Sequence, residues 1–453
     1  MMAAGLARAS VRHRRGTFLA AFLAVFLGAA ILMSFAALLD TAGGPHVTGT
    51  DRNTLTIMAS VVGGWGVLVV ASAVATTLAV AARQRAGELA LLRSLGATPA
   101  QTVRLVVGET ALVGLAGVLL ALPVGYGGGW TLLHLLQDTG QVGDAVGFRF
   151  GASALAVGAG GSLLAALAAS FGTARRAARR RAVEAHRQAA AGGRRTSRFR
   201  LAAGALLVVA GASCAVVTAT ALDASKIESQ SVAGEAAVLS ALGFALLAPV
   251  LLRAVTAALA PLLGAFGAPG RLGVLAVRQR VQRAATAVMP IVLCTAISTG
   301  TLAMQSVWNA AHPHLSADDK GTATLNYVVV GMLAVFAAVM LVNLVVAETA
   351  ARQGEFAQLR LAGATQPQLL RQVAAETALT LVTGLLFGTA AAAASAVPYS
   401  LAVSGDVLPG SAVGIHTAVV AGVAVLALGA ALTAARRAGR APATVALRTA
   451  VAA

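Results

Sequence analysis

Long apolar runs separated by short polar segments make up most of the chain. Each run holds about twenty hydrophobic residues, enough for a helix to cross a hydrocarbon core of roughly 30 Å. Helices are expected rather than strands, because lipid leaves backbone groups unpaired unless a segment bonds to itself. The pattern predicts an all-α polytopic membrane protein with about ten transmembrane helices. They cover residues 17–39, 54–81, 107–136, 151–172, 201–222, 235–260, 286–307, 326–348, 374–398 and 414–434.

Positive charges lie almost entirely between alternate runs. The chain has 34 lysines and arginines against 16 acidic residues, a net charge of +18. All but four of these basic residues fall in the two terminal segments, in alternate loops or, for Arg253, near the end of a helix that leads into such a loop; the exceptions are Arg52, Arg149, Lys226 and Lys320. The positive-inside rule then predicts a multi-pass protein of the cell membrane with both termini in the cytoplasm. The charge reflects topology and contact with anionic membrane lipid, so no nucleic-acid partner is expected.

One charged phrase occurs twice in the sequence. GELALLRSLGAT begins at Gly87, and GEFAQLRLAGAT begins at Gly354. Sixteen of the 28 residues in 85–112 are identical to their counterparts in 352–379. Six predicted helices separate the two copies, and since six is even, both copies face the same way. The repeat is therefore parallel, with its axis along the membrane normal.

The repeat divides the chain into three predicted segments. Residues 1–190 and 271–453 each form a unit of four helices, and residues 191–270 form a linker of two helices. The loops after Asp40 and Trp308 are too short to bury a core of their own. No extracytoplasmic domain is therefore expected.

Each copy of the phrase predicts a short helix, a glycine turn and the start of a new helix. Gly96 and Gly363 stand where a left-handed residue ends a helix. Thr98 with Gln101, and Thr365 with Gln368, have the spacing of a capping box. Apolar residues recur at intervals of three on the short helices: Leu89, Leu92 and Leu95, and Phe356, Leu359 and Ala362.

Two interpretations of this shape remain open from the residues alone. It is either a corner at the membrane surface, with Arg85 and Glu88 as an ordinary i,i+3 ion pair, or a surface presented to a cytoplasmic partner. The second interpretation gains weight because both copies keep Glu, Arg and Gly in register.

The pattern G-E-x-A-x-L-R-x-x-G-A-T, followed by a glutamate at the head of the next helix, resembles the FtsX-like permease domain found in MacB-type subunits of ABC transporters. The resemblance covers both four-helix units. It implies that each phrase is a coupling helix that docks on a separate ABC ATPase, with two ATPase copies per chain. The docking residues that it implies are Glu88, Leu92, Arg93, Gly96, Glu355, Leu359, Arg360 and Gly363.

No nucleotide-binding loop of the pattern G-x-x-x-x-G-K-[ST] occurs in the sequence. No cofactor or enzymatic activity is therefore expected in this chain, and ATP and magnesium would belong to the partner ATPase. His312, His314, Asp318 and Asp319 are close in sequence, but they are interpreted as a solvated loop and not as a metal site.

Glu109 and Glu376 occupy equivalent positions near the membrane boundary of the third helix in each unit. Ionisable residues at such a depth are costly and often functional. Alternatively, each is an interfacial glutamate beside Arg104 or Arg371 that extends toward water. The sequence leaves both interpretations open.

The resemblance implies a permease that couples ATP hydrolysis in a partner to movement of a substrate. Without an outer domain, the expected substrate is an apolar or amphipathic molecule that is exported or extracted from the membrane. One alternative is a regulatory membrane module that controls an extracytoplasmic partner such as a cell-wall hydrolase. Another is a secondary transporter, which is disfavoured by the repeated phrase and by the lack of a chain of charged residues in the middle of the predicted helices.

Overall fold

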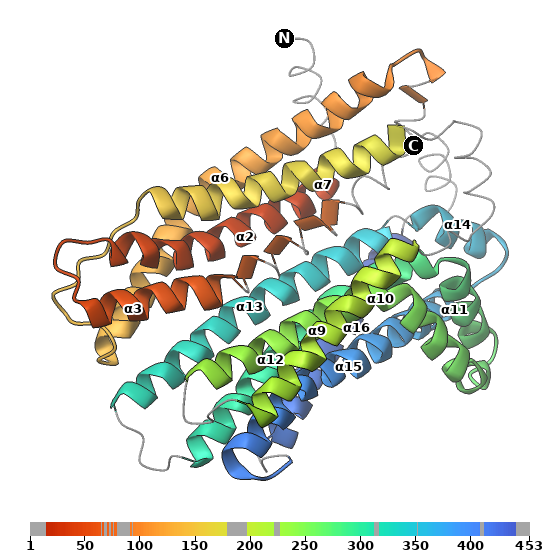
Figure 1. Cartoon of the computed structure of the whole chain (residues 1–453). Coiled ribbons are helices and arrows are strands. Elements are labelled where there is room, and N and C mark those ends of the chain that lie inside the picture. The colour runs from red at the N-terminus through yellow and green to blue at the C-terminus, as the bar shows by residue number, and fades with distance from the viewer. Residues whose placement is uncertain are drawn as a thin grey trace. The chain divides into compact units, whose positions relative to one another are not determined.

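The computed structural model describes most of the chain (Figure 1). The described residues are 15–64, 66–67, 70–71, 74–75, 77–78, 91–92, 94–178, 197–221, 227–311, 317–350, 352–407 and 412–440. Within these ranges the chain forms helices joined by turns and loops, with no strand. Eight of the helices there are long and apolar enough to cross a membrane, and Val330–Val346 is a shorter apolar stretch. The all-α polytopic fold predicted from the sequence is confirmed.

The described helices correspond closely to the predicted ones. Their bounds are α2 Arg15–Ala42, α3 Gly49–Ile57, η1 Met58–Val62, α6 Pro99–Asp138, η2 Ala154–Gly160, α7 Gly161–Ala178, α9 Arg198–Thr220, α10 Ile227–Gly264, α11 Ala268–Gln279, α12 Val281–Ala311, α13 Ala317–Ala350, α14 Gln353–Leu361, α15 Gln366–Ser404 and α16 Ala412–Arg440. The predicted helix over 54–81 is represented by α3, η1 and the helical residues described between 63 and 78.

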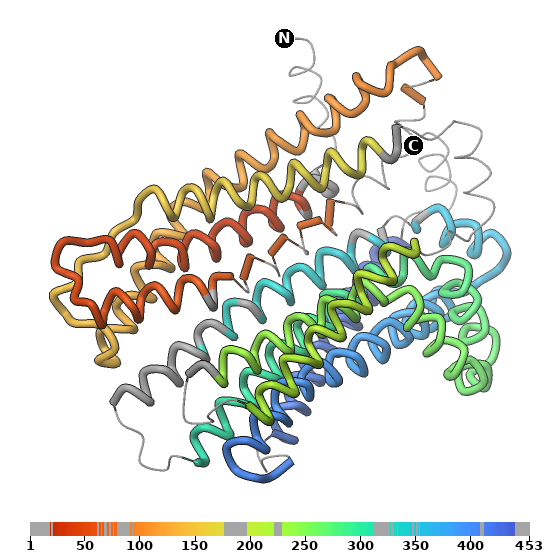
Figure 2. The backbone as a smooth tube through the Cα atoms, in the orientation of Figure 1, coloured from red at the N-terminus to blue at the C-terminus, as the bar shows by residue number. Residues whose placement is uncertain are grey.

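The chain divides into two compact units. The first contains Met1–Arg180 and Trp308–Phe336, and the second contains Arg181–Val307 and Ala337–Ala453. In the first unit α2, α6 and α7 pack against one another, as the backbone trace in Figure 2 shows.

Small residues bring α6 close to α2 in the first unit. A Cβ atom at Gly125 would lie 2.7 Å from the Cβ of Met33, and one at Gly129 would lie 3.0 Å from the Cβ of Ala37. Real Cβ atoms do not pack so closely, so only glycine permits this separation of the two backbones. The Gly125–Gly129 pair is thus a helix-packing motif of the GxxxG type.

Asp40 fixes the C-terminal end of α2. Its carboxylate accepts hydrogen bonds from the backbone N–H groups of Gly151, Ser153 and Ala154 at 2.8, 2.8 and 2.9 Å. These groups begin the helical segment that continues into η2, and the first N–H groups of a helix need such partners. The connection between α6 and η2 is therefore held directly against α2.

Helix α15 is the centre of the second unit. It contacts α9, α10, α11 and α16, so both linker helices pack on a helix of the second repeat. Close packing recurs here, because a Cβ atom at Gly388 would lie 2.7 Å from the Cβ of Thr295 in α12. The boundaries proposed from the sequence repeat, 1–190, 191–270 and 271–453, stay predictions.

The two glycine turns have the predicted geometry. Gly96 and Gly363 have φ angles of +97° and +93°, which side chains other than glycine rarely adopt. Thr98 begins α6 with a capping box to Gln101, and the same arrangement begins α15 after the second turn. Short-range sequence signals therefore predicted both turns correctly.

Candidate functional site

Helix α14 and the turn after it contain the second copy of the repeated phrase. Phe356 and Ala357 are buried, and Leu359 packs on the same hydrophobic cluster, which is completed by residues of α13, α15 and α16. The predicted apolar stripe of this copy thus anchors α14 to its own unit. Only its last member, Ala362, is exposed.

Arg352 lies directly before α14 and forms a two-pronged ion pair with Glu376 of α15. Its Nη1 and Nη2 atoms donate to the Glu376 carboxylate at 2.5 and 2.9 Å. Its guanidinium carbon also lies 5.0 Å from the centre of the Phe356 ring. Because only 16% of the Arg352 side chain and 14% of the Glu376 side chain are exposed, removal of either partner would leave a largely buried charge uncompensated.

The ion pair is part of a longer chain of contacts. Arg352 Nε donates to Glu355 of α14 at 3.2 Å, and Arg280, between α11 and α12, also pairs with Glu355. At the other end, Gln372 Nε2 donates to Glu376 at 3.0 Å. We call Arg280, Glu355, Arg352, Glu376 and Gln372 the charged cluster. It connects α14 both to the start of α12 and to α15.

The charged cluster fixes the protonation state of Arg352. Burial by itself lowers the pKa of this guanidinium, but the charges and hydrogen bonds of Glu376 and Glu355 outweigh burial and raise the pKa above its ordinary value. Arg352 therefore stays positively charged throughout the range in which a protein can function.

The other residues predicted for docking in this copy also contact their own unit. Arg360 Nη1 donates to the carbonyl oxygen of Gly439 in α16 at 2.7 Å. Glu355 and Leu359 are engaged as described above, whereas Gly363 is exposed. The surface of this copy that is open to a partner is thus the turn, where 61% of Leu361 is exposed. Docking on an ATPase stays a prediction.

The turn of the first copy also presents apolar side chains. Leu91, Leu92 and Leu95 are 62%, 38% and 78% exposed, and Gly96 follows them. The docking residues Glu88 and Arg93 lie outside the described residues. Exposed leucines before a glycine of positive φ are therefore common to both copies.

Of the acidic pair predicted near the membrane boundary, Glu109 is buried and Glu376 is largely buried. Glu109 of α6 is 1% exposed, and Glu376 is held by Arg352 and Gln372. Arg371, the neighbour considered from the sequence, is instead exposed. The partner of Glu376 comes from the segment before α14, 24 residues earlier in the chain.

A signal for this partner was present in the sequence. Arg85 and Glu109 repeat the separation of Arg352 and Glu376, so the repeat marked both members of the pair. Arg280, in contrast, lies outside the matched stretch. Its role could not have been found from the repeat.

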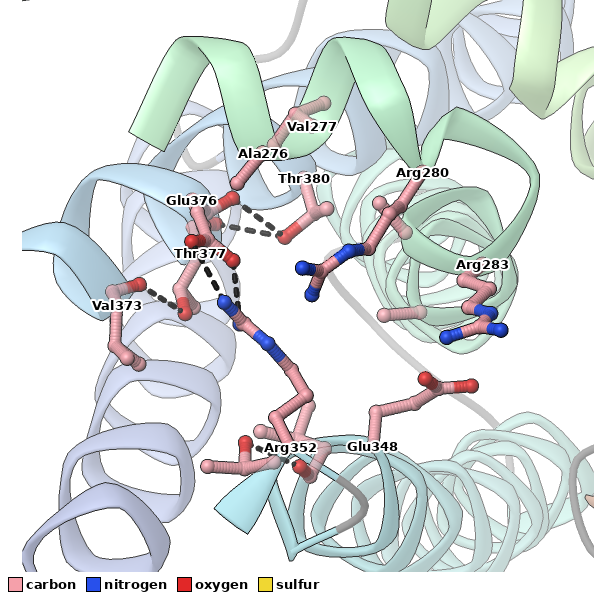
Figure 3. A pocket seen from close by; sticks show the side chains of 14 residues that line it. Ala276, Val277, Arg280, Arg283, Glu348, Arg352, Val373, Glu376, Thr377 and Thr380 are labelled. Carbon is pink, nitrogen blue, oxygen red and sulfur yellow. Dashed lines mark hydrogen bonds and ion pairs between the residues drawn. The ribbon is translucent and has the colours of Figure 1, made fainter. Parts of the chain in front are cut away.

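A pocket with a volume of about 100 Å³ opens beside the charged cluster, between α11, α12, α13 and α15. Figure 3 shows the side chains of Arg280, Arg283, Glu348 and Arg352 extending toward the space between these helices. The rest of the lining includes small or apolar residues, such as Ala287, and three threonines. The arrangement suits an anionic group that is attached to an apolar body.

No metal site is evident in the part of the chain that the structure describes. No group of three or more histidine, cysteine or acidic side chains there could hold an ion. His312 and His314 lie outside that part.

Both repeats match the same protein family. Residues 60–182 and 327–443 match the family model of the FtsX-like permease C-terminal domain. The two stretches cover more than half of the chain, and each contains one copy of the repeated phrase. A search of curated proteins gave no match.

Proposed function

The chain belongs to the FtsX-like permease family, the membrane subunits of ABC transporters, and from this premise we propose that separate ATPases drive it to move an apolar or amphipathic substrate. One observation carries the proposal: the same exposed glycine turn occurs in both repeats, each beside a helix long enough to cross a membrane. Two turns that face the same way would receive two ATPase subunits.

The contacts of α14 divide its residues between two roles in this proposal. Glu355 and Arg360 hold the helix to its unit, while Leu361 and Gly363 in the second repeat, and Leu92, Leu95 and Gly96 in the first, would contact the ATPase. Glu88 and Arg93 would serve the first repeat as Glu355 and Arg360 serve the second. A short helix that is rigidly held transmits displacement better than a loose loop.

The charged cluster supplies a route for that displacement. A force on α14 would act on α15 through the Arg352–Glu376 pair and on the start of α12 through the Glu355–Arg280 pair. ATP binding can shift the arrangement of these helices only by its differential free energy for the two states. Because the ion pairs join α14 directly to α12 and α15, less of that energy would be lost in local motion of α14.

The remaining features of the proposal follow from the sequence. The turns and both termini face the cytoplasm of a cell membrane, as the distribution of basic residues favours. ATP and magnesium belong to the partner, and the chain itself is not an enzyme. Only residues 43–48 separate α2 from α3, which supports a substrate drawn from the lipid rather than one captured by an outer domain between these helices.

The proposal is tested by co-expressing the chain with an ABC ATPase encoded beside it and measuring the number of ATPases that copurify. Glu355 is unsuitable for mutation here because its replacement would disturb the charged cluster. Leu95→Glu and Leu361→Glu instead place a charge on each exposed turn. We expect two ATPases per wild-type chain, one for each single variant and none for the double variant.

Val407→Glu is the matched control. Val407 is 58% exposed and follows the opposite end of α15, so its replacement should leave both ATPases bound. A folded wild-type chain that captures no ATPase, or a double variant that still binds two, would contradict the docking proposal.

A further inference from the structure

The pocket beside the charged cluster is lined by arginines and by small apolar residues. Arg280 and Arg283 lie at the start of α12, and Arg352 follows the end of α13. Ala284 and Ala287 lie further into α12, about 5 and 9 Å beyond its first residue at 1.5 Å per residue. The arginines of this part of the chain are thus followed along α12 by small apolar residues that also line the pocket.

The three arginines that line the pocket differ in how many partners they have. Arg352 holds Glu376 and Glu355, and Arg280 contacts Glu355 through Nη1 alone. An arginine has five N–H donors, so Arg280 retains further donors. The Arg283 side chain is exposed and makes no hydrogen bond or ion pair with any other described residue.

We propose that this pocket binds the phosphate of a membrane phospholipid, with Arg283 and Arg280 as its donors. Three arginines and two glutamates line the pocket, which gives its lining a positive balance. Glu348 lies in the same space and accepts from the Thr286 hydroxyl at 3.4 Å. Because its charge repels an anion, Arg280 and Arg283 together have to offset it when the phosphate binds.

The apolar part of the lining favours a lipid over soluble phosphate. Val345 of α13 and Val373 of α15 line the pocket together with the alanines of α12 and with three threonines, and the apolar surfaces gain nothing from a small hydrated ion. A phosphodiester with an attached glycerol and acyl chain uses both parts, because arginine binds the phosphate oxygens and the chain removes apolar surface from water.

Bound lipid would also affect the charged cluster. A phosphate on Arg280 competes with Glu355 for the same guanidinium and so weakens one of the two connections between α14 and the membrane helices. This regulatory consequence rests on the proposed function, whereas the binding site does not. Lipid occupancy would lower the coupling between ATP hydrolysis and helix movement through the start of α12.

The binding experiment uses the full purified chain in detergent, stripped of lipid, and native mass spectrometry to count adducts. The probes are dioleoyl phosphatidylglycerol, dioleoylglycerol and inorganic phosphate. Arg283→Gln is compared with Arg278→Gln, which removes the same charge from an exposed position of α11 outside the pocket. Both variants should fold as the wild type does, as their unchanged melting temperatures would show.

We expect one phosphatidylglycerol bound by the wild type and by Arg278→Gln, and affinity about ten-fold weaker in Arg283→Gln, the loss typical of one charged hydrogen bond. Dioleoylglycerol should not bind at the same concentration. Equal phosphatidylglycerol binding by both variants, or equal binding of dioleoylglycerol, would overturn the site.

The measurement with inorganic phosphate shows whether the ligand is a lipid headgroup or the free ion. Binding of this ion with the same dependence on Arg283, together with displacement of phosphatidylglycerol, would overturn the lipid assignment. No ATPase is present in this experiment, so its failure would leave the docking proposal untouched. A failure to copurify ATPases would likewise leave the lipid site standing.

Discussion

Arg352 and Glu376 are 24 residues apart in sequence and form a largely buried, two-pronged ion pair between the end of α13 and the first third of α15. The pair encloses α14 and its turn within the chain that connects its two members. Any displacement of that short helix therefore acts on the pair directly. Its integrity is the condition for α14 to move together with the membrane helices.

Arg352→Gln should destabilise the second unit strongly. Glu376 would lose its main counter-charge while 14% exposed, and breaking a buried pair in this way costs about 3–5 kcal/mol. The melting temperature of the purified chain in detergent measures the loss. Arg371→Gln removes an exposed charge from the same helix as Glu376 and should change stability by less than about 0.5 kcal/mol.

The exchange Arg352→Glu with Glu376→Arg tests the pair itself. It restores opposite charges across the contact, so the double variant should melt above either single replacement, although the two-pronged geometry is not fully recovered. Equal melting temperatures for Arg352→Gln and Arg371→Gln would show that the ion pair contributes nothing measurable.

The raised pKa of Arg352 predicts a distinctive response to alkaline pH. A group whose folded pKa lies above its unfolded value stabilises the fold below the unfolded pKa, and this contribution is lost only as pH rises through the folded pKa. For Arg352 that window lies above the already high ordinary pKa of an arginine. Arg352→Lys replaces it with a group whose ordinary pKa is about 10.4.

The difference in melting temperature between wild type and Arg352→Lys should therefore be constant near neutral pH and grow as pH rises above about 10.4, where an unfolded lysine loses its proton. Taking the difference cancels the titration of groups that both proteins share. A difference that stays constant over this range would show that the charge at this position does not support the fold.

Local signals in the sequence predicted the local structure well. The capping box at Thr98 and the left-handed turns at Gly96 and Gly363 are properties of four to six neighbouring residues, and all are present. The long apolar runs predicted membrane helices for the same reason, because helix formation in lipid depends on the composition of one segment.

Contacts between distant segments were harder to predict from the sequence. The helical spacing of Phe356 and Leu359 indicated an apolar face, but could not show that this face packs inward on α14's own unit. Nor could it show that Glu355 is shared by Arg280 and Arg352. Such contacts depend on how three helices converge, and sequence periodicity describes only one helix at a time.

Close packing between α2 and α6 leads to a prediction about Gly128. A Cβ atom there would overlap the Ser34 hydroxyl, while the Ser34 Cβ would lie 3.2 Å away. Gly128→Ala should therefore destabilise the first unit by about 1–3 kcal/mol, as overpacking does. Adding Ser34→Ala removes the obstructing oxygen and should recover most of the loss in melting temperature.

Ser34→Ala alone serves as the control for that pair. It loses the hydroxyl's hydrogen bond to the Ala30 carbonyl, which measures 2.8 Å, at a cost of about 1 kcal/mol. A double variant that melts no higher than Gly128→Ala would show that α6 does not approach α2 at this position.

Gly363 gives a prediction that joins local structure to the proposed function. Its φ of +93° is strained for a β-branched residue, so Gly363→Val should cost about 1–3 kcal/mol. The Ala364 N–H, which bonds to the Leu359 carbonyl at 2.9 Å, should then exchange hydrogen faster. Under the docking proposal, ATPase copurification should fall from two subunits to one.

Gly429→Ala is the control for Gly363→Val, because Gly429 lies inside α16 with open space around it. Alanine there should be neutral or stabilising, since glycine in a helix interior costs about 0.5–1 kcal/mol, and two ATPases should remain bound. Faster hydrogen exchange at Ala364 in Gly363→Val, with both ATPases still bound, would support the geometry of the turn and contradict its role in docking. The turn would then be formed as described, but the ATPase would dock elsewhere.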